Sequence, residues 1–201
     1  MSILEFAIFS IKSPHTIDTP ELKSALQHAL QVLKKASGFT FNLFHQIEDR
    51  SILYLIGAWT SLEAHSEFLV SPENLSLLSA VKDFINVDRL SHANIDQSAF
   101  PLEAPCVGVS RVLIKDGEKE ELIKTWDTIS ESIAEYRKPY KSAGGWIIDE
   151  ESGGREWILF REFGSVEQHR DLPEVVSTAY GKIMVFVEKY NNLGHVEPLG
   201  W

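Results

Sequence analysis

The two halves of this 201-residue chain repeat one another weakly but in the same order. The stretch Trp59–His65 returns 104 positions later as Phe163–His169, and both read aromatic-x-Ser-aliphatic-Glu-x-His. Leu90–His92 returns 103 positions later as Leu193–His195. Matches at one nearly constant offset predict a tandem duplication, which restricts the fold to two similar units.

Two prolines, Pro101 and Pro105, lie between the repeats and interrupt any regular element there. We therefore predict a first module over residues 1–97, a linker over 98–105 and a second, more divergent module over 106–201. Modules of this size can bury most of their apolar side chains.

Hydrophobic periodicity predicts the same order of elements in each half. The expected strands of the first half span residues 4–11, 39–47, 52–59 and 88–95. Helices are expected after Thr19-Pro20 and after Thr60-x-x-Glu63, because a proline at the first helical position and a capping box are typical helix starts. The order β-α-β-β-α-β is that of a ferredoxin-like unit, with helices on one face of an antiparallel sheet. We therefore predict an α+β fold of two tandem ferredoxin-like modules.

The first and third expected strands carry apolar side chains on both faces, so the face away from the helices also needs cover. The residues concerned are Phe6, Ile8, Phe9, Leu53, Leu55 and Ile56. Packing the two sheets together would cover these faces and enclose a mostly apolar cavity, suited to a flat hydrophobic ligand.

Charge and composition exclude several classes of partner. With 19 basic and 29 acidic residues and a formal charge of −10, the chain would repel nucleic acid and anionic membranes. The apolar runs are far shorter than the ~20 residues of a membrane helix, and the N-terminal residues lack a basic signal-peptide region. We expect a soluble, cytoplasmic protein. The single cysteine, Cys106, precludes an intrachain disulfide or thiolate cage.

The order of elements, the duplication and the aromatic-x-Ser-x-Glu-x-His stretch followed by Ser71-Pro72 resemble the dimeric α/β-barrel proteins, specifically the antibiotic-biosynthesis monooxygenase-like (ABM) branch in a fused form. The resemblance implies two antiparallel sheets packed into a pseudo-dimeric α/β barrel. The family includes cofactor-independent oxygenases of polycyclic phenols, polyketide cyclases and haem-degrading enzymes. The haem-degrading arrangement of asparagine, histidine and tryptophan is absent at matching places, and no nucleotide or metal motif occurs, so we expect no cofactor and no metal.

The histidines are the natural candidates for chemistry, because histidine titrates near neutral pH and moves protons without a cofactor. His92 and His195 occupy equivalent places in the expected fourth strands, and His65 and His169 equivalent places near helix starts. We predict His92, His195 and His65 as catalytic. The predicted substrate-binding residues are His45, Asn42, Trp59, Phe41, Arg111 and His169. The competing interpretations are structural. They are backbone bonding for His92 and His195, packing at the helix start for His65 and His169, and a place in the helix-facing core for His45. For the aromatic residues the alternative is core packing, and for Arg111 it is an acid partner.

These observations favour a cofactor-independent enzyme of secondary metabolism, of monooxygenase or cyclase type. It would act on an aromatic or polyketide-like molecule by histidine acid/base catalysis in a hydrophobic cavity. The alternative is a non-catalytic small-molecule-binding or stress-related barrel. Because a fused pair satisfies internally what single modules achieve by association, we expect either a monomer with an internal pseudo-dimer or a homodimer.

Overall fold

A computed structural model describes residues 2–149 and 153–200 of the chain. The elements of the first half are β1 (Ile3–Ile11), α1 (Pro20–Ser37), β2 (Asn42–Gln46), β3 (Ile52–Trp59), α2 (Leu62–Leu69), α3 (Pro72–Val81) and β4 (Ile85–Ala93). A short 3-10 turn, η1 (Gln97–Ala99), leads to the second half. Its elements are β5 (Cys106–Ile114), α4 (Lys119–Arg137), β6 (Ser142–Trp146), β7 (Glu156–Phe163), α5 (Val166–Arg170), α6 (Glu174–Met184) and β8 (Val187–Pro198). The predicted α+β class is confirmed.

The repeated Ser-x-Glu motif is a helix start in both halves. Ser61 caps α2, its Oγ accepting a hydrogen bond from the Ala64 amide at 3.2 Å. The cap is therefore one residue later than the predicted capping box, which began at Thr60. Ser165 caps α5 in the same way, accepting from the Gln168 amide at 3.3 Å. Such caps satisfy amides that the first turn of a helix leaves without partners. The motif therefore fixes the residue at which each helix begins. It thereby also fixes the position of the histidine that is the last residue of the motif.

The strands form one antiparallel sheet in the order β4-β1-β3-β2-β8-β5-β7-β6. The halves join through β2 and β8, where His45 lies opposite Glu197. The two edge strands, β4 and β6, meet at one end only, through an isolated bridge between Ala93 and Ile147. The sheet is therefore eight-stranded and strongly bent back on itself, but its hydrogen-bonded ladder is not closed.

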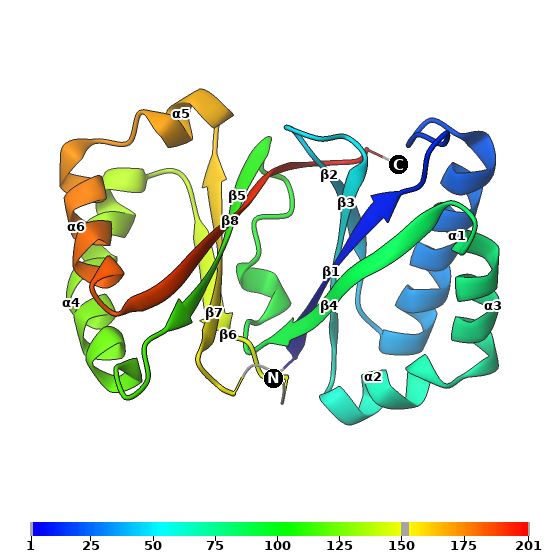
Figure 1. Cartoon of the computed structure of the whole chain (residues 1–201), viewed down its shortest axis with the longest axis horizontal. Helices are drawn as coiled ribbons and strands as arrows, with labels where there is room; N and C mark the ends of the chain where they lie inside the picture. The colour runs from blue at the N-terminus through cyan, green and yellow to red at the C-terminus, as the bar shows by residue number, and fades with distance from the viewer. Residues whose placement is uncertain (1, 150–152, 201) are drawn as a thin grey trace.

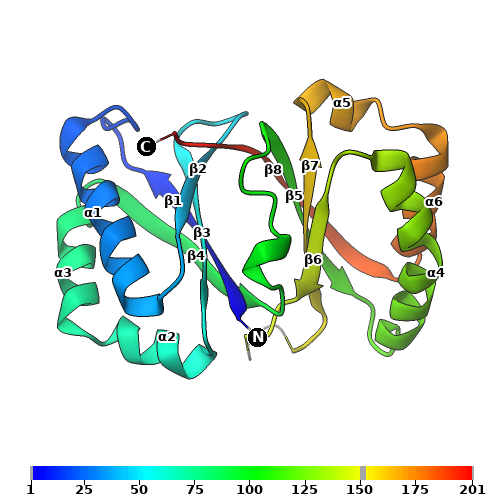
Figure 2. The same ribbon diagram turned by 180° about the vertical axis from the view of Figure 1, so that it is seen from behind.

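The helices lie on the outside of this sheet. In Figure 1, α1, α2 and α3 cover one flank and α4, α5 and α6 the other, with all strands between them. The opposite view in Figure 2 shows the segment between β4 and β5 passing between the two half-sheets. Each half-sheet thus has an outer face toward its helices and an inner face toward the other half.

The space between the half-sheets is filled by a hydrophobic core, contrary to the expectation of an enclosed ligand cavity there. The rings of Phe6 and Phe160 meet edge to face at a centroid distance of 6.1 Å. Phe100, from the segment between β4 and β5, packs against Phe160 at 4.9 Å and Phe44 at 5.7 Å. Phe100 of the connecting segment therefore helps to fill the space between the two half-sheets. The apolar pockets lie instead between each half-sheet and its helices.

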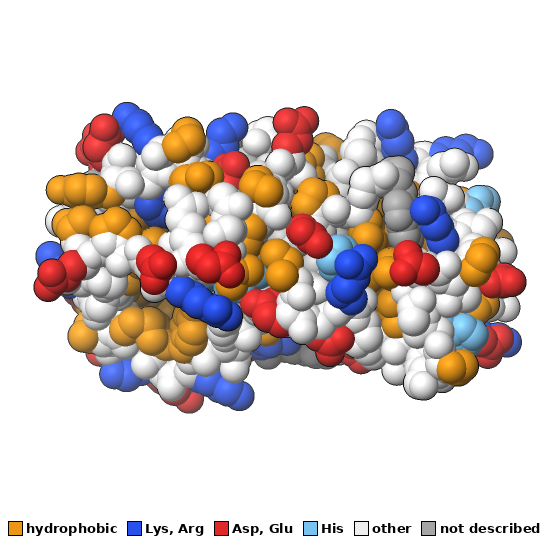
Figure 3. All heavy atoms as spheres, turned by 90° about the horizontal axis from the view of Figure 1, so that it is seen from above, with side chains coloured by type: hydrophobic (Ala, Val, Ile, Leu, Met, Phe, Trp, Pro, Cys, Tyr) orange, Lys and Arg blue, Asp and Glu red, His pale blue; other side chains and the backbone are white. Residues whose placement is uncertain are grey.

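The surface carries charges of both signs. In the space-filling view of Figure 3, acidic and basic side chains are interspersed with small hydrophobic patches. Within residues 2–149 and 153–200, no helix has the length and apolar character needed to cross a membrane.

Candidate functional site

Two of the predicted catalytic histidines lie in direct contact. His65, in the first turn of α2, and His92, near the end of β4, are both buried. His65 Nδ1 and His92 Nε2 are 2.7 Å apart, which is a hydrogen bond between the rings. The His65 ring also stacks on Trp59 at a centroid distance of 4.7 Å. Three predicted site residues therefore form one buried cluster.

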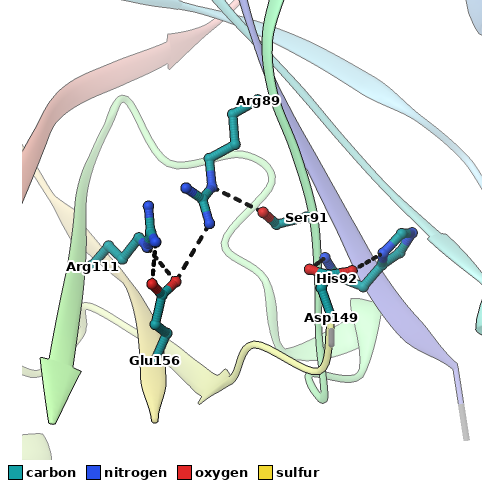
Figure 4. Close-up of polar contacts among 6 residues, drawn as sticks. All are labelled: Arg89, Ser91, His92, Arg111, Asp149 and Glu156. Atoms are coloured by element: carbon teal, nitrogen blue, oxygen red, sulfur yellow. Dashed lines mark hydrogen bonds and ion pairs between the residues drawn. The ribbon is translucent and has the colours of Figure 1, made fainter. Parts of the chain in front are cut away.

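A carboxylate that the sequence analysis missed lies at each end of this pair. Asp149, from the second half of the chain, accepts hydrogen bonds from His92 Nδ1 at 2.7 Å and from the His92 amide at 2.8 Å (Figure 4). Glu5, on β1, has its Oε2 atom 3.5 Å from His65 Nε2 and accepts a hydrogen bond from Trp59 Nε1. Asp149, His92, His65 and Glu5 form a continuous row, which we call the histidine relay.

The second half contains a partial copy of this row. His195 Nε2 lies 2.6 Å from His169 Nδ1, and the His169 ring stacks on Phe163 at 4.2 Å. Glu48, from the first half, accepts from the His195 amide at 3.0 Å and from its Nδ1. The predicted residues His195 and His169 are thus the counterparts of His92 and His65.

Each histidine pair is held by a carboxylate from the other half of the chain. The same junctions carry matching backbone bonds, from the Ile148 amide to the His92 carbonyl at 3.0 Å and from the Ile47 amide to the His195 carbonyl at 2.7 Å. Asp149 and Glu48 are the next residues along the chain. A comparison of the segments that follow the second strand of each half would therefore have found both acids.

The two copies differ at their inner ends. Strand register places Glu5 opposite Gly57 in β1 and β3, but Gly108 opposite Arg161 in β5 and β7. A Cβ atom added at Gly108 would lie 3.2 Å from His169 Nδ1, so a side chain there would crowd the ring. The first copy therefore ends in a carboxylate, whereas the second has no acid at that position and carries a guanidinium on the neighbouring strand.

Burial and hydrogen bonding set the charges along the relay. Burial raises the pKa of Glu5, against the opposing effects of the Trp59 hydrogen bond and the His92 charge. Burial, and then the His92 charge, lower the pKa of His65 to about 4. Partial burial acts to raise the pKa of Asp149, but the hydrogen bonds from His92 outweigh it and lower the pKa overall. Near neutral pH, His65 is neutral and Asp149 is ionised.

The relay has two hydrogen-bonding patterns with the same number of protons. In one, neutral His65 donates from Nδ1 to His92, and Glu5 carries a proton that points toward His65 Nε2. In the other, His92 is protonated on both nitrogens, and His65 donates from Nε2 to the Glu5 carboxylate. Passing between them moves one proton equivalent from Glu5 to His92, where ionised Asp149 stabilises the resulting charge. The 3.5 Å contact between Glu5 and His65 must shorten for this transfer.

The inner end of the relay lies on the wall of an apolar pocket, the first pocket. It has a volume of about 320 Å³ and lies between the first half-sheet and helices α1, α2 and α3. Its polar lining residues are Glu5, His65 and Asn74, and the Asn74 side-chain amide is bonded to the Leu69 carbonyl at 2.9 Å. Glu5 and His65 are thus the acid/base groups that a molecule in this pocket would meet.

The outer end of the relay lies at a polar pocket of about 350 Å³, formed between β4 and the second half. Asp149 lines it together with Glu156, on which two arginines converge (Figure 4). Arg111 Nε donates to Glu156 Oε2 at 2.6 Å, and Arg89 lies 3.4 Å from the same oxygen. The Asp149 side chain is 27% exposed, so the relay runs from the buried carboxylate of Glu5, on the wall of the apolar pocket, to a carboxylate that reaches solvent.

Four predicted substrate-binding residues lie outside the relay. His45 bonds the Gln46 carbonyl at 3.2 Å and Glu197 at 2.9 Å, at the junction of β2 and β8. Phe41 packs on Trp59 in the core beneath the helices. The structure places Arg111 in an ion pair rather than in either apolar pocket. The fourth is Asn42, which lies opposite Ile56. The buried Nδ2 atom of Asn42 has no partner among the described residues.

Glu5, His65 and His92 also have the donor types of a metal site, since one ligand atom of each lies within 4.8 Å of the others. The observed His65–His92 nitrogen separation of 2.7 Å is shorter than the roughly 3.3 Å that Zn–N bonds of about 2.0–2.1 Å give in a tetrahedral site. A shared proton therefore accounts for this contact. Haem fits neither apolar pocket, because both His65 nitrogens face polar partners and no histidine is among the described residues lining the pocket of the second half.

Comparison with known proteins identifies the fold. No protein-family model and no curated protein matches the sequence. Among solved structures, an anthrone oxidase-like protein matches with a TM-score of 0.67 and 11% identity over 98% of this chain and 91% of its own. A candidate monooxygenase of Fusobacterium nucleatum matches with 0.66 and 11% over 98% and 91%. A mutant chlorite dismutase of Candidatus Nitrospira defluvii matches with 0.69 and 13% over 100% and 91%. At these identities the likeness shows the fold alone: this chain has the fold shared by these monooxygenase-like, anthrone oxidase-like and chlorite dismutase proteins.

Proposed function

We propose that the protein is a cofactor-independent enzyme that removes a proton from a neutral aromatic or polyketide-like substrate held in the first pocket. The observation that carries this proposal is the histidine relay. It joins a buried carboxylate on the wall of an apolar pocket to a carboxylate at the solvent-facing polar pocket. Glu5 would be the base, and His65 and His92 would carry the proton away.

Desolvation makes Glu5 suited to this task. A carboxylate in an apolar pocket is a stronger base than one in water, because water no longer stabilises its charge. Ionised Glu5 would take a proton from a phenolic O–H, or from a C–H flanked by aromatic rings or a carbonyl. The proton then passes through His65 to His92, and Asp149 holds the resulting imidazolium. Loss of that proton to the polar pocket restores Glu5.

The deprotonated substrate determines the reaction that follows. An electron-rich carbanion or phenolate reacts with dioxygen without a cofactor. For a ring CH₂ group, one oxygen atom becomes the new carbonyl and the other leaves as water, with both hydrogens. The fold shared with monooxygenase-like and anthrone oxidase-like proteins favours this branch. Attack of the same carbanion on a carbonyl of the substrate would instead give a cyclase.

The pseudo-dimeric barrel belongs to this proposal. Its support is that the half-sheets meet at two equivalent junctions. One is a ladder between β2 and β8, and the other is a bridge from Ala93, at the end of β4, to Ile147, the residue after β6. Because one chain supplies both acids and both histidine pairs, a monomer would be sufficient for activity.

Hydrogen exchange in the absence of oxygen tests the base directly. Anthrone and a panel of polycyclic phenols would be incubated with the protein in deuterated buffer, and incorporation at carbon followed by NMR. Oxygen uptake would be measured separately. Glu5→Gln should abolish catalysed exchange, whereas His169→Gln, in the copy without a base, should leave it unchanged.

The same experiment distinguishes the proposed enzyme from the non-catalytic alternative. Binding of the panel molecules without exchange would favour the non-catalytic small-molecule-binding barrel. The second histidine pair keeps this interpretation open, because Gly108 leaves it without a carboxylate at its inner end. Wild-type exchange in Glu5→Gln would contradict the assignment of Glu5.

A further inference from the structure

The second half has its own apolar pocket, the second pocket, with different chemistry from the first. It has a volume of about 410 Å³ and lies between the second half-sheet and helices α4 and α6. Trp126, Trp157 and Leu159 are among its apolar lining residues. Its charged lining group is Arg161, whereas that of the first pocket is Glu5.

Arg161 is a buried cation whose hydrogen-bonding capacity is largely unused. Arg161 is only 6% exposed. The guanidinium donates one hydrogen bond, from a terminal nitrogen to Ser110 Oγ at 2.9 Å. Its buried Nε has no partner, and no carboxylate of the described residues forms an ion pair with it. The ring centroids of Tyr180 and Phe163 lie 5.3 and 5.9 Å from its guanidinium carbon. Buried arginines are normally paired with an acid.

A second buried cation lies close to Arg161. Arg137, also buried, lies over the Phe163 ring and donates to the Glu162 carbonyl at 2.5 Å. The Glu162 carboxylate instead accepts from the Lys141 amide at 3.0 Å. Burial, and then the charge of Arg161, lower the pKa of His169 to about 3, so this histidine stays neutral beside them.

We propose that the second pocket binds an organic anion with a flat apolar body, such as an aromatic carboxylate or sulfonate. The anion would accept hydrogen bonds from the Arg161 guanidinium, whose planar shape matches the spacing of carboxylate oxygens. The rings would lie against Trp126 and Trp157. The duplicated pockets thus select different ligands, because Arg161 replaces Gly57 and Gly108 replaces Glu5. This site is independent of the proton-abstracting function proposed above.

A pair of fluorescent probes that differ in one charge tests the inference. Anilinonaphthalenesulfonate and phenylnaphthylamine share their ring systems, but only the first carries an anion. Titrations would use the full chain, its Arg161→Gln and Arg161→Lys variants, and Arg170→Gln as the control, because Arg170 is exposed and lines neither apolar pocket. Arg161→Gln should weaken the anionic probe about tenfold or more and leave the neutral probe within about twofold. Arg161→Lys should fall between, and Arg170→Gln should bind the anionic probe like wild type.

Equal weakening of both probes, or no weakening of the anionic one, would overturn the inference. Circular dichroism establishes whether each variant is folded. Should Arg161→Gln not fold, competition on the wild-type protein still decides: naphthoate should displace the anionic probe, and the neutral isostere naphthalenemethanol should not. Equal displacement by the two competitors would refute an anion site. None of these outcomes depends on hydrogen exchange at Glu5.

Discussion

Replacing Glu5 by glutamine should make the protein more stable while it removes the proposed base. The amide keeps the shape of the site: its oxygen can accept the Trp59 Nε1 hydrogen bond, and its NH₂ group can donate to His65 Nε2. What the substitution removes is a buried negative charge. Glutamine therefore tests the charge of Glu5 separately from its packing.

The pH dependence of this effect follows from the raised pKa of Glu5. A carboxyl group whose pKa is higher in the folded than in the unfolded protein binds its proton more tightly in the fold. Wild-type stability should therefore fall as pH rises from the ordinary value of 4.5 through the folded pKa. The glutamine variant lacks this loss. We expect no difference near pH 4. Above the folded pKa, the variant should gain about 1.4 kcal/mol in the free energy of unfolding for every pH unit by which burial raises the pKa of Glu5.

Urea denaturation at several pH values between 4 and 9 measures this difference, and a gain of 1 kcal/mol corresponds to about 2–4 °C in melting temperature for a chain of this size. Glu48→Gln is the matched control. Partial burial acts to raise the pKa of Glu48, but its hydrogen bonds to His195 lower it overall, so Glu48 stabilises the fold above its unfolded pKa and loses this effect as pH falls. Its variant should lose stability at neutral pH. A Glu5→Gln variant that is less stable than wild type at every pH would refute the reasoning.

Three further outcomes are expected. Asp149→Asn removes the ionised acceptor of two His92 hydrogen bonds and should slow catalysed exchange by about 10²-fold. NMR of the His92 ring should show the altered tautomer. An unchanged rate would show that the proton leaves by another route. Trp59→Phe keeps a stacked ring, as Phe163 does in the second half, but removes the hydrogen bond that lowers the pKa of Glu5. The acidic limb of the exchange–pH profile should move to higher pH, and an unmoved limb would argue against Glu5 as the titrating group. The isolated segment 1–97 should dimerise in sedimentation measurements, because the inner apolar face of its sheet is otherwise exposed. In this dimer, Glu48 of each copy would take the place of Asp149. A folded monomer would contradict this expectation.

The sequence predicted the local parts of this molecule well, because they depend on local signals. The repeated aromatic-x-Ser-aliphatic-Glu-x-His stretch is a short pattern, and it placed His65 and His169 at equivalent points near helix starts. The predicted capping box at Thr60 was one residue early, since Ser61 is the cap. Contacts between histidines depend on how α2 lies against β4, which no local pattern specifies. The pairs could therefore be predicted as equivalent residues but not as bonded ones.

The acids were missed for a different reason. Glu5 interrupts an apolar strand on the side that faces the helices, and its equivalent is Gly108, so the repeat gives no matching signal. Asp149 and Glu48 act on the opposite halves of the chain, over separations that periodicity does not reach. The expected cavity between the sheets was wrong because Phe100, from a segment interpreted only as a linker, fills it.

The exchange of acids between the halves explains how two pockets could diverge within one chain. Each histidine pair is anchored at its outer end by a carboxylate of the other half, so these contacts hold the halves together whatever lies at the inner ends. The inner positions are then free to change without loss of the junction. A carboxylate at Glu5 and a guanidinium at Arg161 occupy neighbouring strands of equivalent half-sheets, and each lies on the wall of an otherwise apolar pocket. Since the outer contacts are shared and the inner charges are opposite, the two proposed functions would divide between the pockets while the junction stays the same.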